Sequence, residues 1–246
     1  MGETVPRSCR IAVVILAVLS ATGVARAKPS DPTVVRHELL GRSALDRPIH
    51  VVEVGDPDEM RKVLVVGCIH GDEPQGIRIA QALAATKPST NVDLWIIPTL
   101  NPDGVAAHTR QNAHGVDLNR NFPWRWRRLG SRGYRYYSGP RPLSEPETRL
   151  AARIILRLRP VVSIWFHQPY GLVDESGGGD LNLERRFASL VDLPLVRLQR
   201  FPGSVVSWEN HTLPGTTAFV VELDAGALSQ PKLDGFVNAV RLVSSP

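Results

Sequence analysis

The sequence is poor in cysteine, with two among its 246 residues, Cys9 and Cys68. Cys9 precedes an amino-terminal apolar run that we expect to be removed by processing, and one remaining thiol cannot form an internal disulfide. The fold must therefore be stabilised by its core, which a chain of this length can make large. Cys68 lies within an apolar segment, so we interpret it as a small core residue, with a metal ligand as the weaker alternative.

Proline, glycine and serine do not gather into a linker in the middle of the chain, and no internal repeat or low-complexity tract is visible. Domain boundaries are usually marked by such linkers. We therefore expect one domain, spanning residues 28–246.

Long hydrophobic runs are also missing. The apolar run Ile11–Leu19 is much shorter than the roughly 20 residues that a membrane-spanning helix needs. Arg7 and Arg10 precede the run, and the small residues after it end in Ala25-Arg26-Ala27, which has the form of a cleavage site. We predict a secretory signal peptide over residues 1–27, with an uncleaved anchor as the alternative. The mature protein is then expected outside the cytoplasm, in the periplasm or cell wall, with no stable membrane span.

The net charge of the whole chain is +5, and removal of residues 1–27 leaves 26 basic and 23 acidic side chains, a net charge of +3. Much of the positive charge lies between Arg125 and Arg141, in a segment that is also rich in tryptophan and tyrosine. Arginine and aromatic side chains are typical of proteins that bind single-stranded nucleic acid. Because we expect secretion, we interpret the segment instead as a solvated loop near the substrate entrance that could attract an anionic cell wall. No nucleic acid partner is expected.

Four short apolar segments predict buried strands, and each is followed by polar residues. Open α/β sheets bind their ligands at the carboxyl ends of the strands, so these polar residues are candidates for a site. Ser144 and Glu147 have the spacing of a capping box at the start of a helix. The strands are expected at Val63–Ile69, Leu94–Leu100, Val161–Phe166 and Ala218–Val221, and the helices near residues 74–86, 145–158 and 232–243.

His70 and Glu73 lie three residues apart, where the first strand ends and Pro74 begins a helix. Pro74 keeps Glu73 out of the helical region, so its carboxylate can turn back toward the imidazole. A His-x-x-Glu spacing alone is more often a surface histidine beside a helix-start acid than a metal site. Further polar residues at the ends of the later strands are the Asn101-Pro102-Asp103-Gly104 turn, His167 and Glu222.

This order of residues resembles the zinc carboxypeptidase family, whose pattern is His-x-x-Glu, an Asn-Pro-Asp-Gly turn, an arginine ahead of Asn-Arg, a distant histidine and a late glutamate. The resemblance covers most of residues 48–223. Gly-Val-Asp-Leu-Asn-Arg-Asn-Phe-Pro, at residues 115–123, is most similar to the small bacterial branch that includes murein peptide amidases. The resemblance implies an α/β fold, a mixed twisted β-sheet flanked by helices on both faces. A decayed, metal-free relative is the alternative.

The resemblance also implies one catalytic zinc ion (Zn2+) per chain, held by His70, Glu73 and His167. Two histidines and one carboxylate leave a fourth zinc position open for water. The other family positions imply Glu222 as the general base, Arg110 as the residue that stabilises the oxyanion, and Asn119 with Arg120 as the pair that binds the substrate carboxylate.

Two aspartates near these positions, Asp103 and Asp117, are expected to be turn residues or to accept the free N–H of a ligand histidine. Four further histidines match no motif position. We interpret them as structural or exposed: His37, His50, His108 and His114.

Tyrosine marks one departure from the family pattern. Conventional carboxypeptidases carry a mobile tyrosine between the third ligand and the catalytic glutamate, whereas this chain has no tyrosine from Gly171 to its end. Trp208 or His211 could close the pocket instead, although we favour a packed tryptophan and a loop histidine. The family also has an unusual cis peptide after the third ligand, which predicts a cis Gln168-Pro169 bond.

We predict a secreted zinc-dependent peptidase or amidase that hydrolyses an amide bond next to a free carboxylate. Cell-wall (murein) peptide, a peptidoglycan stem peptide, is the favoured substrate. Two alternatives stay within this class: a conventional metallocarboxypeptidase that acts on scavenged peptides, and an amino-acid deacylase. A third is a secreted protein that binds peptide carboxylates without turnover, which Glu222 disfavours because binding needs no general base.

Overall fold

The computed structural model describes residues 1–2 and 33–245, so nearly all of the predicted signal peptide lies outside the described residues. Its centre is an eight-stranded sheet with the strand order β1-β2-β4-β3-β5-β8-β6-β7. The strands are β1 (Val34–Arg42), β2 (Pro48–Gly55), β3 (Lys62–Val66), β4 (Asp93–Ile97), β5 (Val162–His167), β6 (Tyr170–Asp174), β7 (Leu195–Val196) and β8 (Thr217–Asp224). The helices are α1 (Gln75–Ala84), α2 (Pro102–Ala107), α3 (Pro146–Leu158), α4 (Leu181–Leu190), α5 (Val205–Thr212) and α6 (Gln230–Ser244), with a 3-10 turn η1 at Leu118–Arg120.

The sheet is mixed. Its central strands β4, β3, β5 and β8 are parallel, whereas β2 pairs with β4 and β6 pairs with β8 in antiparallel fashion. Parallel central strands end at one edge of the sheet, and the side chains that follow them gather there. The predicted mixed sheet with helices on both faces is confirmed.

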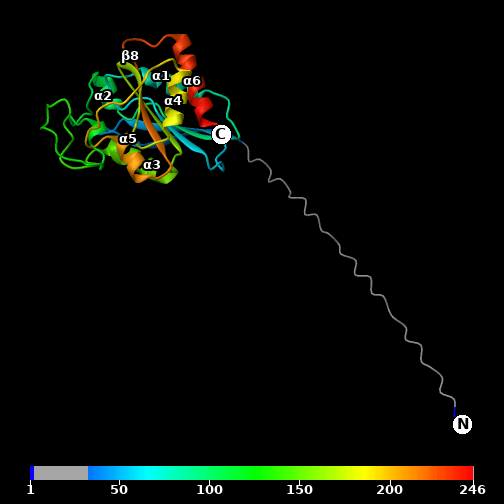
Figure 1. The fold of residues 1–246 in the computed structure, drawn as a ribbon. Helices are drawn as coiled ribbons and strands as arrows, with labels where there is room; N and C mark the ends of the chain where they lie inside the picture. The colour runs from blue at the N-terminus through cyan, green and yellow to red at the C-terminus, as the bar shows by residue number, and fades with distance from the viewer. Residues whose placement is uncertain (3–32, 246) are drawn as a thin grey trace. The chain divides into compact units, whose positions relative to one another are not determined.

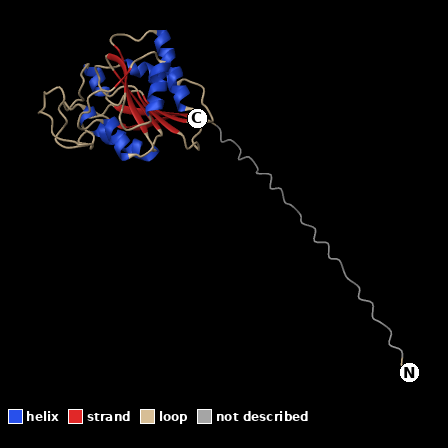
Figure 2. Ribbon diagram, viewed as in Figure 1, coloured by secondary structure: helices blue, strands red, loops and turns tan. Residues whose placement is uncertain are grey.

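Helices cover both faces of the sheet, with α1, α4 and α6 on one side and α3 and α5 on the other (Figures 1 and 2). Strand β3 shows why both faces must be covered, because Val63 and Val65 pack into the first core cluster while Leu64 and Val66 pack into the second. Successive side chains of a strand point to opposite faces, so a continuous apolar run needs apolar partners on each side.

The first two predicted strands end earlier than expected. Strand β3 ends at Val66 rather than Ile69, and β4 ends at Ile97 rather than Leu100. The segments that follow β3 and β4 stay side by side beyond the last strand pairing, because the Leu100 amide donates to the Cys68 carbonyl at 2.8 Å. The apolar residues after Val66 and Ile97 are buried, as their apolarity predicted. Burial continues past the last hydrogen bond of the strand pairing, so it does not mark where the strand ends. Cys68 itself is a buried core residue, as predicted.

The predicted capping box of α3 is wrong. The helix begins at Pro146 with Glu145 as its N-cap, and no side chain caps it. Ser144 donates its hydroxyl to Glu145 instead, at 2.6 Å. Glu147 turns away from the helix start and accepts the Ala44 amide at 2.9 Å. A tertiary partner therefore replaces the local one that the spacing predicted.

Gly203 allows a close approach between two loops beside η1. Its φ is +75°, and a Cβ here would lie 2.0 Å from the carbonyl oxygen of Arg120. The Phe122 amide donates to the Gly203 carbonyl at 3.0 Å, so the contact is a backbone pairing that a side chain would force apart.

We predict that Gly203→Ala lowers the free energy of unfolding by about 2–5 kcal/mol, because a left-handed backbone costs about 1–2 kcal/mol and the steric overlap about 1–3 kcal/mol more. Gly133→Ala is the matched control, since Gly133 also has a positive φ but has open space around it. It should show the backbone cost alone. Urea denaturation of both variants measures the difference, and equal losses would contradict the steric part of this explanation.

Candidate active site

Two neighbouring segments bring His70, Glu73 and His167 together. His70 follows β3, and the Glu73 amide donates to the His70 carbonyl at 3.0 Å, which forms the turn that leads into α1. His167 is the last residue of β5, the parallel neighbour of β3. One candidate ligand atom from each residue lies within 4.8 Å of the others, and all three residues are buried. We call these residues the metal triad.

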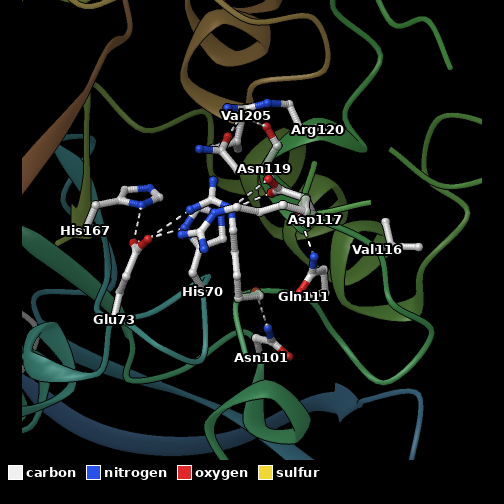
Figure 3. Close-up of polar contacts among 12 residues, drawn as sticks. His70, Glu73, Asn101, Gln111, Val116, Asp117, Asn119, Arg120, His167 and Val205 are labelled. Carbon is white, nitrogen blue, oxygen red and sulfur yellow. Dashed lines mark hydrogen bonds and ion pairs between the residues drawn. The ribbon is translucent and has the colours of Figure 1, made fainter. Parts of the chain in front are cut away.

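The carboxylate of Glu73 lies between the two imidazoles (Figure 3). Its Oε2 is 2.9 Å from Nδ1 of His70 and 2.8 Å from Nδ1 of His167. Burial by itself raises the pKa of Glu73, but the two imidazoles outweigh it and hold the pKa well below its ordinary value. Glu73 is therefore an ionised acceptor at neutral pH.

Asp117 holds the far side of the His70 ring. Its Oδ1 is 3.1 Å from Nε2 of His70, and its Oδ2 accepts from Nε of Arg110 at 2.9 Å. Arg110 also donates to Oε1 of Glu73 at 3.0 Å. Asp117 thus has the partner that we expected for an aspartate near a ligand histidine, and this contact fixes the ring orientation. Asp103 does not reach the site, because it accepts from the Leu45 amide.

The metal triad has donors that suit zinc, which takes imidazole nitrogen and carboxylate oxygen in catalytic sites. Both Nδ1 atoms point at the same carboxylate oxygen, so each needs a proton to hydrogen-bond it. A divalent cation held between these three side chains would take the place of these protons. The Nε2 atom of His167 is buried without a hydrogen-bond partner among the described residues, and Nδ1 is the nitrogen that contacts Glu73.

Glu222 lies next to the third member of the metal triad. Strands β5 and β8 pair in a register that sets Glu222 directly opposite His167. The sequence predicted Glu222 just after the strand, but the structure places it inside β8. Its Oε2 is buried and has no hydrogen-bond partner among the described residues, and burial raises its pKa. A carboxylate with a free oxygen and a raised pKa is suited to accept a proton.

Asn119 and Arg120 lie in η1, whose start is capped by Asp117 through the Asn119 amide at 3.0 Å. The Asn119 side-chain oxygen accepts the Val205 amide at 3.0 Å, so its NH₂ group remains as a donor. The guanidinium carbon of Arg120 lies 4.4 Å from the ring centroid of Phe201 and 5.6 Å from that of Tyr136. Nη1 of Arg120 donates to the Asn119 carbonyl at 2.7 Å, and Nε is buried. The two rings and this bond orient the guanidinium, and Nη2 is left for a ligand. We call Asn119 and Arg120 the clamp.

One cavity of about 380 Å³ joins these groups. All seven predicted site residues line it: His70, Glu73, Arg110, Asn119, Arg120, His167 and Glu222. Sequence reasoning missed several other lining residues, among them Tyr136, Asp174, Arg200 and Phe201. Tyr136 belongs to the aromatic and arginine-rich segment, which was the sequence signal for it.

Neither Trp208 nor His211 lines this cavity. Trp208 is buried against Phe122, with ring centroids 5.5 Å apart, as we expected of a packed tryptophan. His211 is exposed, but it lies in α5 and not in a loop. Tyrosines from before Gly171 line the cavity instead, namely Tyr136 and Tyr170.

The remaining predictions about this region have mixed outcomes. The Gln168-Pro169 bond is cis, as predicted. The histidines without a motif position, His37, His50, His108 and His114, are all exposed. His114 nevertheless has a partner, with its Nδ1 2.6 Å from Oε2 of Glu145. No helix within residues 33–245 has the length and apolarity to cross a membrane.

The sequence profile of the zinc carboxypeptidase family matches residues 24–173. Murein peptide amidase A of Escherichia coli (strain K12) is 33% identical over 220 residues, which cover 83% of this chain and 89% of that protein. The Vibrio campbellii protein of the same name is 28% identical over 80% of this chain and 84% of its own.

Solved structures agree with this match. The murein-tripeptide amidase of Escherichia coli O157 superposes with a TM-score of 0.69 at 25% identity, over 88% of this chain and 95% of that one. Carboxypeptidase A of Helicoverpa armigera superposes with a TM-score of 0.74 at 18% identity, over 86% of this chain and 68% of that one, and supports the fold alone.

We predict that the purified mature protein binds about one zinc ion and that His70→Ala, Glu73→Ala and His167→Ala each abolish binding, because two ligands cannot hold the metal. Asp117→Asn should weaken zinc affinity by about 10–100-fold, since it removes the negative charge of the acceptor that orients His70. His50→Ala, an exposed histidine on β2, is the control. Metal analysis with chelator competition measures these values, and undiminished zinc in all three triad variants would end the metal-site interpretation.

Proposed function

Because the chain belongs to the zinc carboxypeptidase family, we propose that it is a zinc-dependent peptidase or amidase that hydrolyses an amide bond next to a free carboxylate. We propose murein peptide, the stem peptide of peptidoglycan, as its substrate. The observation that carries this proposal is that the metal triad, Glu222 and the clamp line the same cavity. A binding protein would have no use for a buried carboxylate with a free oxygen beside the triad.

Each group has a distinct task in the reaction. A zinc ion held by His70, Glu73 and His167 would act as a Lewis acid on the scissile carbonyl and acidify the attacking water. Glu222 takes the proton of that water and later delivers it to the leaving amine. Its buried, unpaired Oε2 supports this assignment, because no protein donor competes for the proton-accepting oxygen.

Arg110 is proposed to stabilise the negative charge that develops on the carbonyl oxygen. It lines the cavity and is held by two carboxylates, those of Glu73 and Asp117. Such contacts fix the guanidinium before the substrate arrives, so little reorganisation is needed as charge develops.

The clamp is proposed to bind a carboxylate next to the scissile amide. Arg120 is oriented by Phe201 and Tyr136, and Asn119 is oriented by the Val205 amide. A guanidinium fork and an amide donor match the two oxygens of a carboxylate. This would restrict hydrolysis to an amide whose leaving residue carries a free carboxylate.

Two observations support murein peptide over other carboxylate-bearing peptides. The murein peptide amidases of Escherichia coli and Vibrio campbellii match the chain over most of their length. The signal-peptide pattern of residues 1–27 supports action outside the cytoplasm, where the cell wall lies. We propose cleavage between D-glutamate and meso-diaminopimelate.

Glu222→Gln should retain the fold and the zinc but lose activity by about 10²–10⁴-fold, because an amide has the shape of the carboxylate and cannot accept the proton. Steady-state hydrolysis of a muropeptide, with zinc content measured in parallel, checks this. Glu38→Gln, on the edge strand β1, is the control and should be fully active. A Glu222→Gln enzyme with half the activity would place the general base elsewhere.

Arg120→Ala should reduce cleavage of muropeptides with free diaminopimelate carboxylates by about 10²-fold or more, because loss of a desolvated arginine-carboxylate contact commonly costs a few kcal/mol. Amidation of the carboxylate that faces the clamp should weaken cleavage by the unmodified enzyme in the same way. Arg128→Ala, in the exposed arginine-rich segment, is the control. Product masses from a muropeptide digest report both effects. Removal of C-terminal residues from ordinary L-peptides, with no action on muropeptides, would refute the cell-wall substrate and leave the zinc hydrolase intact.

A further inference from the structure

An ion pair that the mechanism above does not use, Asp174 with Arg200, also lines the cavity of the metal triad. Oδ1 of Asp174 accepts from Nη2 of Arg200 at 3.0 Å. Oδ2 of Asp174 accepts a second bond from Nη1 of Arg200. The Asp174 side chain is buried, and that of Arg200 is 24% exposed. The cavity wall therefore carries both a negative and a positive group away from the metal triad.

Strand register places this pair near Glu222. Strand β6 runs antiparallel to β8, with Leu172 opposite Glu222 and Val173 opposite Val221. Side chains two residues apart on a strand share a face, so Asp174 lies on the same face as Glu222, at a diagonal position. Diagonal neighbours in antiparallel pairs are about 7–8 Å apart. Asp174 is thus about one extended side chain away from the proposed general base, and Arg200 is bonded to it.

The chain segment of Arg200 also leads to the clamp. The next residue is Phe201, whose ring lies against the guanidinium of Arg120. Residues 198–201 all line the cavity. This short segment therefore connects the two arginines along the cavity wall. Phe201 contacts Arg120, which is proposed to bind the carboxylate next to the scissile bond, and Arg200 is the second arginine.

An apolar substrate side chain would suit this wall poorly. It would remove the water that remains around the partly exposed Arg200 and offer no new partner, and desolvation of a charged group is costly. Nη2 of Arg200 also donates to the Glu175 carbonyl, and Oδ1 of Asp174 also accepts the Leu198 amide at 2.9 Å. Nε of Arg200 is buried and has no hydrogen-bond partner among the described residues, so not every donor of the guanidinium is used by the protein. A substrate group with both an ammonium and a carboxylate would give each member of the pair a partner of opposite charge.

We propose that Asp174 and Arg200 form a subsite for the ammonium and carboxylate groups at the far end of a diamino dicarboxylic acid residue. This inference rests on the proposed function and names the feature by which the enzyme selects its leaving residue. The clamp binds the carboxylate next to the scissile amide, and the side chain of the residue extends to the Asp174–Arg200 pair. A lysine residue offers an ammonium group to Asp174 but no carboxylate to Arg200, and norleucine offers neither group.

The test compares three tripeptides of the form L-alanyl-γ-D-glutamyl-X, with meso-diaminopimelate, L-lysine or L-norleucine as X. The unmodified holoenzyme should show kcat/KM in that order, with steps of roughly tenfold or more, because a site built for polar groups rejects analogues that lack them. Arg200→Gln should abolish the advantage of diaminopimelate over lysine and change kcat/KM for lysine less than about threefold. Asp174→Asn should abolish the advantage of lysine over norleucine.

Arg197→Gln is the matched control, since Arg197 lies three residues earlier in the same segment, is 66% exposed and lies 3.7 Å from Glu175. It should leave all three rates unchanged. Equal rates of the unmodified enzyme on the three peptides would overturn the proposal whether or not any variant folds. An equal loss on all three in a folded Arg200→Gln or Arg200→Lys enzyme would overturn it too, because that is the effect of a merely structural ion pair. Failure of the unmodified enzyme to cleave any of the three would instead refute the proposed function.

Discussion

The buried carboxylate of Glu73 is the group on which the rest of the site depends. One of its oxygens lies within hydrogen-bond distance of both His70 and His167, and the other accepts from Arg110. An ionised carboxylate is tolerated away from water only when donors surround it in this way. The positions of the donors are therefore coupled to that of the carboxylate. A divalent cation in place of the two imidazole protons would satisfy the same negative charge.

The parallel centre of the sheet makes this arrangement rigid. His167 and Glu222 lie side by side because β5 and β8 are paired in register, and His70 follows β3 on the other side of β5. Both faces of these strands are covered by apolar clusters, so the strands have little freedom to slide. The loops contribute the remaining groups, and they are fixed in turn by Asp117, which contacts both His70 and Arg110.

Local patterns in the sequence predicted much of this correctly. Apolar, β-branched segments indicated the central strands, and Pro74 indicated the corner at which Glu73 turns back. The patterns failed where a distant partner competed with a local one. Glu147 has capping-box spacing but accepts the Ala44 amide, and the chain after Val66 remains buried without strand pairing. An apolar sequence predicts which residues are buried, but burial alone does not determine the residue at which strand hydrogen bonding ends.

The sequence by itself determined the order and type of the groups that form the site, because each follows a strand or turn with a local signal and together they match one family. Only the tertiary structure decided which other side chains share their cavity. Tyr136 and Phe201 orient Arg120, and Asp174 pairs with Arg200, across separations of many residues. Contacts of this kind depend on how loops pack over a sheet edge, and residues far apart in the chain carry no mutual spacing from which such contacts could be read.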